Sequence, residues 1–402
     1  MLDVIIIGGG AAGLFAAANL KTENALLLDH ASEVGKKLLI TGSGMCNLTN
    51  TLSTEDFLTH FGGKYQRNFL LPALQNFPSH RLCEWFSKRG LPTIVREDGK
   101  IFPQSLDAHD VRNLLLTHSK ASIETRATIR AISKVESGFI VETDKTTYEA
   151  KHVLVATGGM SYPRTGSDGS GYELAKSLGH SIIPPKPALV AVSITEYPFK
   201  HLAGNSIRDA SLSLYHEGSS SAYEQRQGDI LFTHDGLSGP AILSASRQMR
   251  KNDLISLTMI SSKNHHEAEQ SVARRLVSST KQVSTVLKES GMSASLAQTI
   301  LNMANIAQDA STANLEKQKR KHLINLVGGM QLTISSTKGF QSAMVTSGGV
   351  NVSEVNRKSM ESNITQGLFF CGEVLDYDGE SGGYNLQSAF STAYLAVQHI
   401  RI

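Results

Sequence analysis

The first thirty residues constrain the fold more than any other stretch, because they predict a strand, a glycine-rich turn, a helix and a second strand. The apolar run Val4-Ile5-Ile6-Ile7 is typical of a parallel strand buried on both faces, where polar and apolar residues need not alternate. Gly8, Gly10 and Gly13 then complete the pattern G-x-G-x-x-G at the start of a helix over 11–20. Asp29 ends the second strand, about 20 residues on, where a carboxylate can bind ribose hydroxyls.

Each glycine of this pattern has its own physical reason. Gly8 permits the tight turn, Gly10 lets the backbone approach a pyrophosphate, and Gly13 allows close packing of helix on strand. The pyrophosphate would accept from the free N–H groups at the positive end of the helix. The alternative is a glycine-rich turn in an ordinary α/β domain, and the pattern alone does not separate NAD from FAD. The neighbouring residues counted with this predicted site are Ala11, Ala12 and His30.

The whole chain sets wider bounds. Its 402 residues are enough for two or three domains. The net charge of +3 is too small to argue for nucleic acid or membrane binding. The three cysteines form no C-x-x-C pair and no metal-ligand spacing, so we expect no metal site and a reducing compartment. No apolar run reaches about 18 residues, which predicts a cytoplasmic protein without membrane association and leaves the oligomeric state open.

Residues 35–50 alternate glycine with small polar residues, which suggests backbone pressed against a ligand. Lys36 and Lys37 could neutralise a phosphate there, or they could be a solvated pair. The candidate cofactor-binding residues of this stretch are Lys36, Lys37, Gly42, Asn47 and Thr49.

This stretch, G-K-K-L-L-I-T-G-S-G-M-C-N-L-T-N, resembles the signature of the YhiN/BaiN-like bacterial flavoproteins. That family comprises NAD(P)/FAD-dependent, aminoacetone-oxidase-like oxidoreductases. Residues 230–240, 343–350 and 367–376 also match it. Met45 stands where the family has an arginine, so any contact made by that arginine is not carried over.

The resemblance implies FAD and adds further binding residues. Residues 153–159, V-L-V-A-T-G-G, resemble the second FAD motif of glutathione-reductase-type flavoproteins. Related flavoproteins have an aspartate at the position of Ser170. By the same resemblance, Glu373 would hold ribityl hydroxyls, the backbone near Ile129 would hold adenine, and the last helix would face the flavin pyrimidine. The residues implied in this way are Ile129, Ala156, Thr157, Gly158, Ser170, Gly372, Glu373, Gly383, Asn385 and Leu386.

Three residues are candidates for catalysis. Cys46 lacks a cysteine at disulfide-reductase spacing, so a structural thiol is preferred over a nucleophile. His234 lies in the family signature I-L-F-T-H-D-G-L-S-G-P and would contact substrate, transfer a proton, or be structural. Because adjacent extended residues point in opposite directions, His234 and Asp235 make a poor dyad. Tyr162 follows the second FAD motif and completes the set.

The periodicity predicts an α/β fold with an insertion. Residues 51–120 read as mainly helical, with Asp107 capping a helix through about 118, and residues 123–132 read as one strand. Residues 189–262 alternate polar and apolar in short runs, as in an antiparallel barrel or sandwich. We therefore expect a discontinuous, Rossmann-like FAD domain of the two-dinucleotide-binding type over 1–189 and 326–402. A β-barrel insert would span 190–262 and a helical insert 263–325.

The helical insert contains nine Lys or Arg and five Asp or Glu, so its excess of +4 exceeds the net charge of the chain. A solvated helix face explains such an excess in most proteins. The alternative is binding of a polyanionic substrate.

The predicted function is FAD-dependent oxidoreduction, with hydride transferred through flavin N5. No second G-x-G-x-x-G unit is present, so NAD(P)H would be a transient reductant. Family members are linked to reduction of carbonyl-conjugated C=C bonds, in enones or RNA uracil, and the basic insert favours this reaction on a small-molecule or RNA substrate. The alternatives are oxidation of a small amine such as aminoacetone, and flavin-dependent binding or sensing without turnover.

Overall fold

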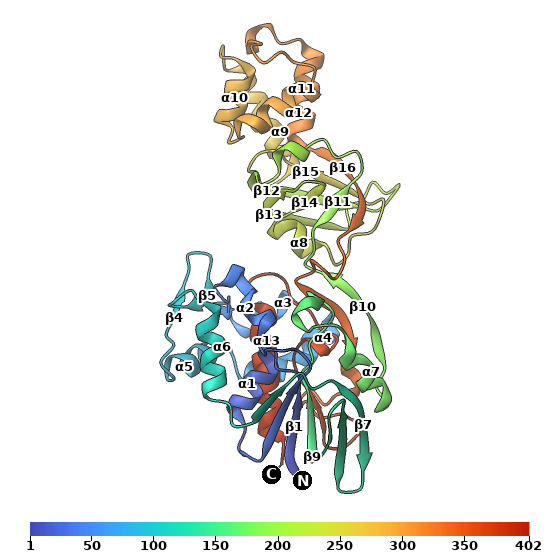
Figure 1. Cartoon of the computed structure of the whole chain (residues 1–402). Coiled ribbons are helices and arrows are strands. Elements are labelled where there is room, and N and C mark those ends of the chain that lie inside the picture. The colour runs from blue at the N-terminus through green and yellow to red at the C-terminus, as the bar shows by residue number, and fades with distance from the viewer. Residues whose placement is uncertain (402) are drawn as a thin grey trace. The chain divides into compact units, whose positions relative to one another are not determined.

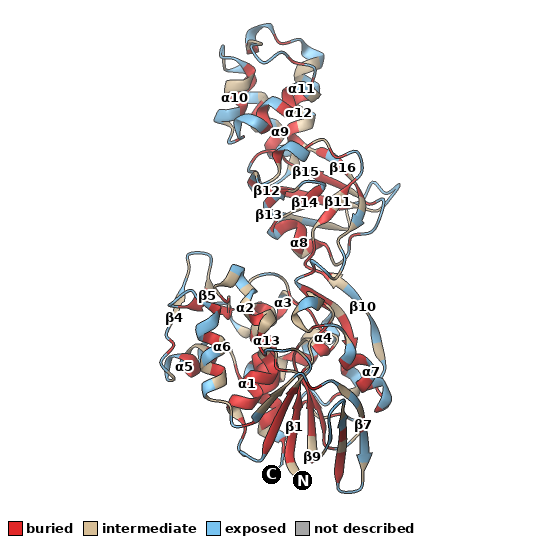
Figure 2. Ribbon diagram, in the orientation of Figure 1, coloured by how far each residue is buried: buried red, intermediate tan, exposed pale blue. Residues whose placement is uncertain are grey.

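The computed structural model of the chain describes residues 1–401, which form two compact units (Figure 1). The α/β unit comprises Met1–Ala188 and the segment from Ala343 onward, and the barrel unit comprises Leu189–Ser342. Each unit has its own hydrophobic core, with buried residues concentrated in the strands and on inward-facing helix surfaces (Figure 2).

A seven-stranded sheet forms the centre of the α/β unit. Its strands are β1 (Leu2–Ile7), β2 (Ala25–Asp29), β6 (Ser122–Thr125), β7 (Ile129–Val135), β8 (Gly138–Thr143), β9 (Thr147–Val155) and β18 (Leu368–Phe370). The order is β6-β2-β1-β9-β8-β7, and β18 pairs with the carboxyl half of β9. The pairs among β6, β2, β1, β9 and β18 are parallel, whereas β7 and β8 are antiparallel. The predicted buried strand is confirmed, since Val4, Ile5 and Ile6 have no exposed surface.

Helices cover this sheet through an aromatic core. They include α1 (Ala11–Asn19), α4 (Lys64–Asn76), α5 (Ser79–Ser87), α6 (Ala108–Thr117) and α13 (Tyr384–His399). The Phe15 ring lies 4.8 Å from that of Phe390 and 4.7 Å from that of Trp85, so α1, α13 and α5 share one core. The side chain of Asp107 accepts from the His109 N–H, which confirms the predicted cap of α6.

Shorter elements complete the α/β unit. The strands β3, β5 and β4 form an antiparallel sheet, and β10 pairs antiparallel with β17, where the chain leaves and re-enters the unit. Their bounds are α2 (Lys36–Leu39), η1 (Thr41–Gly44), β3 (Thr49–Asn50), α3 (Thr54–Thr59), β4 (Thr93–Val95), β5 (Lys100–Pro103), η2 (Pro163–Thr165), α7 (Ser170–Ser177), β10 (Ile182–Ala188), β17 (Val345–Val350), η5 (Val352–Glu354) and η6 (Gly372–Val374).

The barrel unit contains the expected antiparallel barrel. Its strands are β11 (Val192–Ile194), β12 (Ser206–Tyr215), β13 (Glu224–Phe232), β14 (Gly236–Ser238), β15 (Leu254–Leu257) and β16 (Met330–Thr337), accompanied by η3 (Lys200–Leu202) and α8 (Pro240–Ala245). They close in the order β11-β14-β13-β12-β15-β16. Side chains such as Leu212, Leu214 and Phe232 are buried in its core.

A helical module is inserted between β15 and β16 (Figure 1). It contains α9 (His265–Val277), α10 (Val283–Glu289), α11 (Ala294–Met303), η4 (Thr312–Asn314) and α12 (Lys317–Gly328). The His265 ring at the start of α9 lies 2.6 Å from the carbonyl oxygen of Gly328 at the end of α12. Since α9 and α12 also pack along their lengths, the two helices run antiparallel.

The structure corrects two boundaries expected from the sequence. The second segment of the α/β unit begins at Ala343 rather than at 326, because β16 pairs with β11 and β15 and closes the barrel. The expected strand over 123–132 is two strands, β6 and β7. Arg126 between them adopts a left-handed backbone conformation (φ 56°), which turns the chain from pairing with β2 to pairing with β8.

Within residues 1–401, no helix is both long and apolar enough to cross a membrane.

Candidate functional site

The turn between β1 and α1 shows how the three glycines differ. A Cβ at Gly8 would lie 2.5 Å from the carbonyl oxygen of Ala156, and one at Gly13 would lie 1.9 Å from that of Gly8. Both positions therefore bring backbone against backbone. A Cβ at Gly10 would meet no atom of the described residues within 4 Å. Gly10 thus borders open space where α1 begins, so a pyrophosphate could approach Ala11 and Ala12.

Asp29 at the end of β2 is tied to this turn. Its carboxylate accepts from the Gly9 N–H at 2.6 Å and from the Ala31 N–H at 2.7 Å. Neither bond uses all the lone pairs of its oxygen, so ribose hydroxyls could still donate to Asp29. His30, the next residue, is exposed and lies 3.7 Å from Asp168.

The expected adenine contact lies beside Asp29. The Ala127 N–H donates to the carbonyl oxygen of Asp29, and the Arg126 N–H donates to that of Ala31. Ile129 begins β7 two residues later. The backbone before Ile129 therefore runs next to the end of β2.

The segment after β9 contains buried polar atoms without partners among residues 1–401: Thr157 Oγ1, Ser167 Oγ and the Tyr172 hydroxyl. Buried polar groups are normally hydrogen-bonded, so such a cluster fits a ligand that supplies the missing bonds. A Cβ at Gly158 would lie 3.0 Å from Ser167 Oγ, which places the Ala156–Gly158 turn against it. Ser170 begins α7 and donates its N–H to Asp168, so it lies close to the Asp168 partner, His30.

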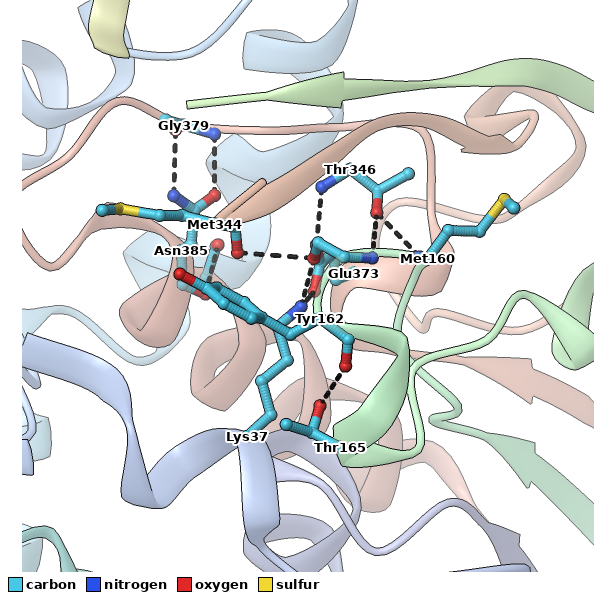
Figure 3. A network of polar contacts seen from close by, with 11 residues as sticks. Lys37, Met160, Tyr162, Thr165, Met344, Thr346, Glu373, Gly379 and Asn385 are labelled. Atoms are coloured by element: carbon cyan, nitrogen blue, oxygen red, sulfur yellow. Dashed lines mark hydrogen bonds and ion pairs between the residues drawn. The ribbon is translucent and has the colours of Figure 1, made fainter. Parts of the chain in front are cut away.

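Lys37 and Glu373, which are 336 residues apart, meet in one polar network (Figure 3). The Lys37 ammonium lies 2.6 Å from Glu373 Oε2 and 2.5 Å from Ser161 Oγ. The other carboxylate oxygen accepts from Ser161 Oγ at 3.0 Å and from the Thr346 N–H at 2.7 Å. Both charged side chains are about a fifth exposed. Lys36 is not part of this network and donates to Ser32 instead.

The network has consequences for the expected role of Glu373. Its carboxylate, in η6, is bonded to Lys37 in α2, to Ser161 in the loop after β9 and to Thr346 in β17. These three donors occupy three of the roughly four lone pairs of the two carboxylate oxygens. Room for a ribityl hydroxyl is therefore limited to the remaining lone pair. Ser161 and Thr346 were not singled out from the sequence, although Thr346 lies in the stretch 343–350 that matches the family.

The segment over 41–50 contacts the start of α13. With its amide oriented to satisfy both groups, the Asn47 oxygen accepts from the Gly383 N–H at 3.0 Å. A Cβ at Gly383 (φ 86°) would lie 2.6 Å from the carbonyl of Thr49, so only glycine fits there. The Thr49 hydroxyl itself donates to Ser79. Gly42, with φ 55°, shapes the preceding turn.

The C-terminal candidates divide into two groups. A Cβ at Gly372 would lie 2.7 Å from that of Ala12, so η6 packs directly on the start of α1. The side chain of Asn385, in contrast, is occupied by both backbone groups of Gly379 (Figure 3). Leu386 is partly buried and packs against the core.

The first turns of α1, α7 and α13 share one property. Each follows a glycine, which has no side chain to accept from the helix N–H groups, although in α7 the Ser170 N–H donates to Asp168. These helices lie beyond the carboxyl ends of β1, β9 and β18, which is where open α/β sheets bind ligands. Free backbone N–H donors are therefore available at the starts of α1 and α13, at the carboxyl end of the parallel strands, and the residues there fit a dinucleotide.

The three candidate catalytic residues occupy different environments. Cys46 is fully buried, and burial raises the pKa of its thiol to about 12, which keeps it protonated. Tyr162 is partly buried and adopts a left-handed backbone conformation (φ 52°), and its carbonyl accepts from the Thr165 hydroxyl (Figure 3).

His234 belongs to the barrel unit and is exposed in the turn between β13 and β14. The turn is closed by hydrogen bonds between Thr233 and Gly236. Asp235 forms an ion pair with Lys338 and accepts from Ser193 at 2.9 Å. Asp235 therefore fixes the turn rather than the His234 ring, in agreement with the expectation that the two form no dyad.

Sequence reasoning missed a histidine–carboxylate pair near Gly383. The His60 ring lies 2.8 Å from Glu380 Oε2 and stacks on Tyr384 at 4.5 Å. Burial raises the pKa of Tyr384 to about 12, with a further contribution from the Glu380 charge. Glu380 precedes the predicted last helix, but no sequence pattern pointed to His60.

Comparisons with known proteins cover nearly the whole chain. It is 31% identical to the ribosomal RNA dihydrouridine synthase of Haemophilus influenzae over 97% of this chain and 96% of that protein. It is 33% identical to the 3-dehydro-bile acid delta(4,6)-reductase of Clostridium scindens, covering 97% of each. The structure of a 3-ketosteroid-delta4-(5alpha)-dehydrogenase from Rhodococcus jostii aligns with a TM-score of 0.52 at 15% identity, over 99% of this chain and 96% of that one, and so shares the fold.

A family model described as HI0933-like protein Rossmann domain matches residues 2–399. This match and the two relatives above 30% identity confirm the resemblance to YhiN/BaiN-like flavoproteins. The chain belongs to the HI0933-like Rossmann family.

Proposed function

We propose that the protein is a FAD-dependent oxidoreductase that reduces a C=C bond conjugated to a carbonyl group. The observation that carries the proposal is its full-length similarity to two named enzymes with very different substrates. A dihydrouridine synthase saturates a bond of the uracil ring beside a carbonyl, and a 3-dehydro delta(4,6)-reductase acts on double bonds conjugated to a ketone. The reacting group is what these substrates share.

The cofactor fits the residues at the carboxyl end of the parallel strands. The open space at Gly10 suits a pyrophosphate, and Asp29 suits a ribose. The uncapped N–H groups of α13 would stabilise negative charge on the flavin pyrimidine. When bound, FAD would supply a hydride from N5 to the β-carbon of the substrate, after NAD(P)H has supplied the two electrons.

The product also needs a proton at the α-carbon, and this chain must provide or relay it. Tyr162 and His234 are the candidates, because Tyr162 is partly exposed and His234 is exposed. Cys46 is assigned a packing role, since its thiol is buried and protonated. Comparing Tyr162→Phe with His234→Gln would separate the two candidates. The variant that still accepts electrons onto its flavin but no longer reduces the substrate identifies the proton donor.

The substrate ring would belong either to RNA or to a free enone. Similarity to an enzyme named for ribosomal RNA and the basic helical module support RNA. Because RNA and NAD(P)H occur together in the cytoplasm, we also propose a cytoplasmic location.

The test is anaerobic reduction of the purified yellow protein by NADH or NADPH, followed by mixing with a 4-en-3-one steroid, a uridine-containing RNA, or oxygen. Re-oxidation by a conjugated acceptor, with a saturated product in mass spectrometry, supports the proposal. Re-oxidation by oxygen alone, together with flavin reduction by aminoacetone, would identify an amine oxidase instead. No electron transfer in any mixture would leave a binding or sensing protein, and colourless protein unaffected by FAD would refute the cofactor assignment.

A further inference from the structure

Positive charge is concentrated in one part of the helical module. Residues 274–321 contain eight Lys or Arg and three Asp or Glu, a net charge of +5, whereas the whole chain has +3. The remaining residues therefore have a net charge of −2. This segment alone makes the protein basic.

The fold gathers these charges at the end of the module away from the barrel. Because α9 leaves the barrel and α12 returns to it, the end of α9 and the start of α12 lie at the same end (Figure 1). The connecting segments are tied to them, since the Thr312 N–H donates to the carbonyl oxygen of Lys281 and Arg320 donates to that of Thr312. We call the exposed cations of this end the basic tip: Arg274, Arg275, Lys281, Lys288, Lys317 and Lys321.

Most of the basic tip is unneutralised. Among the described residues, Lys281 is its one member within 4 Å of a carboxylate, that of Glu289. Glu316 is paired with Lys319, which lies outside the tip. Lys317 and Lys321 are one helical turn apart on the same face of α12, where like charges repel. An anionic partner would relieve this repulsion.

The composition of this end restricts the form of that partner. Residues 274–321 contain no Phe, Tyr or Trp. Proteins that bind single-stranded RNA stack its bases on aromatic side chains, whereas duplex RNA is recognised through its phosphates and shape. The basic tip has the charge for phosphates and lacks a stacking surface for bases.

We propose that the basic tip binds the phosphate backbone of a duplex segment of an RNA substrate, without reading its sequence. The proposal rests on the proposed function, in which the reduced ring is a uracil, and it adds where and how the RNA is held. The docking surface is then separate from the residues that hold the cofactor, all of which belong to the α/β unit.

The test compares two triple variants of the full-length holoprotein. One replaces Lys288, Lys317 and Lys321 with Gln. The matched control replaces Lys21, Lys120 and Lys358 with Gln; these lysines are also exposed and lie in the α/β unit. Binding of a fluorescent RNA hairpin and of a single-stranded RNA of equal length is measured by anisotropy from low to high salt, with flavin content and melting temperature recorded for each protein.

Each phosphate contact contributes about 0.9 to the slope of log affinity against log salt on a duplex. The tip variant should therefore lose about 3 from this slope and, since such contacts contribute little at about 1 M salt, bind the hairpin roughly 500-fold more weakly at about 0.1 M salt. The control should bind as the wild type does, and the wild type should prefer the hairpin to the single strand. Flavin content and re-oxidation by a small enone should be unchanged in all three proteins.

Other results overturn the docking proposal without touching the proposed function, which the enone reaction reports independently. Equal hairpin binding by the tip variant and the wild type, or no binding by either at low salt, would exclude the tip. An equal loss in the control would show a net-charge effect. If vesicles of phosphatidylglycerol bind the wild type more tightly than the hairpin does, the tip is a lipid surface instead.

Discussion

Replacing Gly10 with alanine should separate cofactor binding from folding. The Gly10 backbone (φ −79°, ψ −168°) is open to alanine, and the new methyl group would meet no described atom within 4 Å. Alanine reduces the entropy of the unfolded chain, worth about 0.4–1 kcal/mol, but is a poorer helix N-cap by a similar amount. The stability of the FAD-free protein should therefore change by less than about 1 kcal/mol.

The same methyl group would occupy the space proposed for the pyrophosphate. FAD at 100 times its dissociation constant stabilises a folded protein by about 2.7 kcal/mol, and G10A should lose most of this gain. The assay is thermal unfolding of the FAD-free protein while FAD is titrated, with flavin absorbance measured after desalting. The expected result is a normal melting temperature without FAD and little rise with it.

Gly13→Ala is the matched control. Its Cβ would lie 1.9 Å from the carbonyl oxygen of Gly8, and overpacking of this kind costs about 1–3 kcal/mol or more. G13A should therefore melt several degrees lower even without FAD. A G10A protein that retains FAD like the wild type would refute the pyrophosphate position, and one that melts like G13A without FAD would refute the open space at Gly10.

Three further predictions concern the contacts of Asp29, the burial of Cys46 and the contacts of Arg320. Asp29→Ala removes the acceptor of two backbone N–H groups, and each of these charge-assisted bonds is worth about 1.5–3 kcal/mol. FAD retention on gel filtration and the melting temperature should therefore both fall. Unchanged values would contradict the role of Asp29. Because burial raises the pKa of Cys46 to about 12, the free energy of unfolding should decrease as pH rises above about 9, where the unfolded thiol ionises. Urea unfolding of Cys46→Ala should show a smaller decrease, and identical pH profiles would count against this. Arg320→Gln removes a guanidinium that donates to two backbone carbonyls and should destabilise the protein by about 1–3 kcal/mol, whereas Lys317→Gln should change urea unfolding by less than about 0.5 kcal/mol.

The features that could be predicted from the sequence are those stabilised by residues close together along the chain. Gly13 requires glycine because its Cβ would lie 1.9 Å from the carbonyl oxygen of Gly8, five residues earlier in the same strand–turn–helix unit. The Asp107 cap is satisfied two residues away, by His109. The alternation of Leu212 and Leu214 with Ser211 and Ser213 identifies β12 as a strand, whichever strands pair with it, but it does not reveal that both faces are buried over 210–214.

The tertiary structure decided which distant segments meet. The sequence analysis assigned residues 330–337 to the FAD domain, and only the pairing of β16 with β11 and β15 places them in the barrel. Glu373 was expected to meet a cofactor, yet its carboxylate is bound by Lys37, 336 residues away, and by Ser161, 212 residues away. The physical reason is that periodicity and caps arise from local geometry, whereas the choice among distant partners depends on packing, desolvation and hydrogen bonding of the whole folded chain.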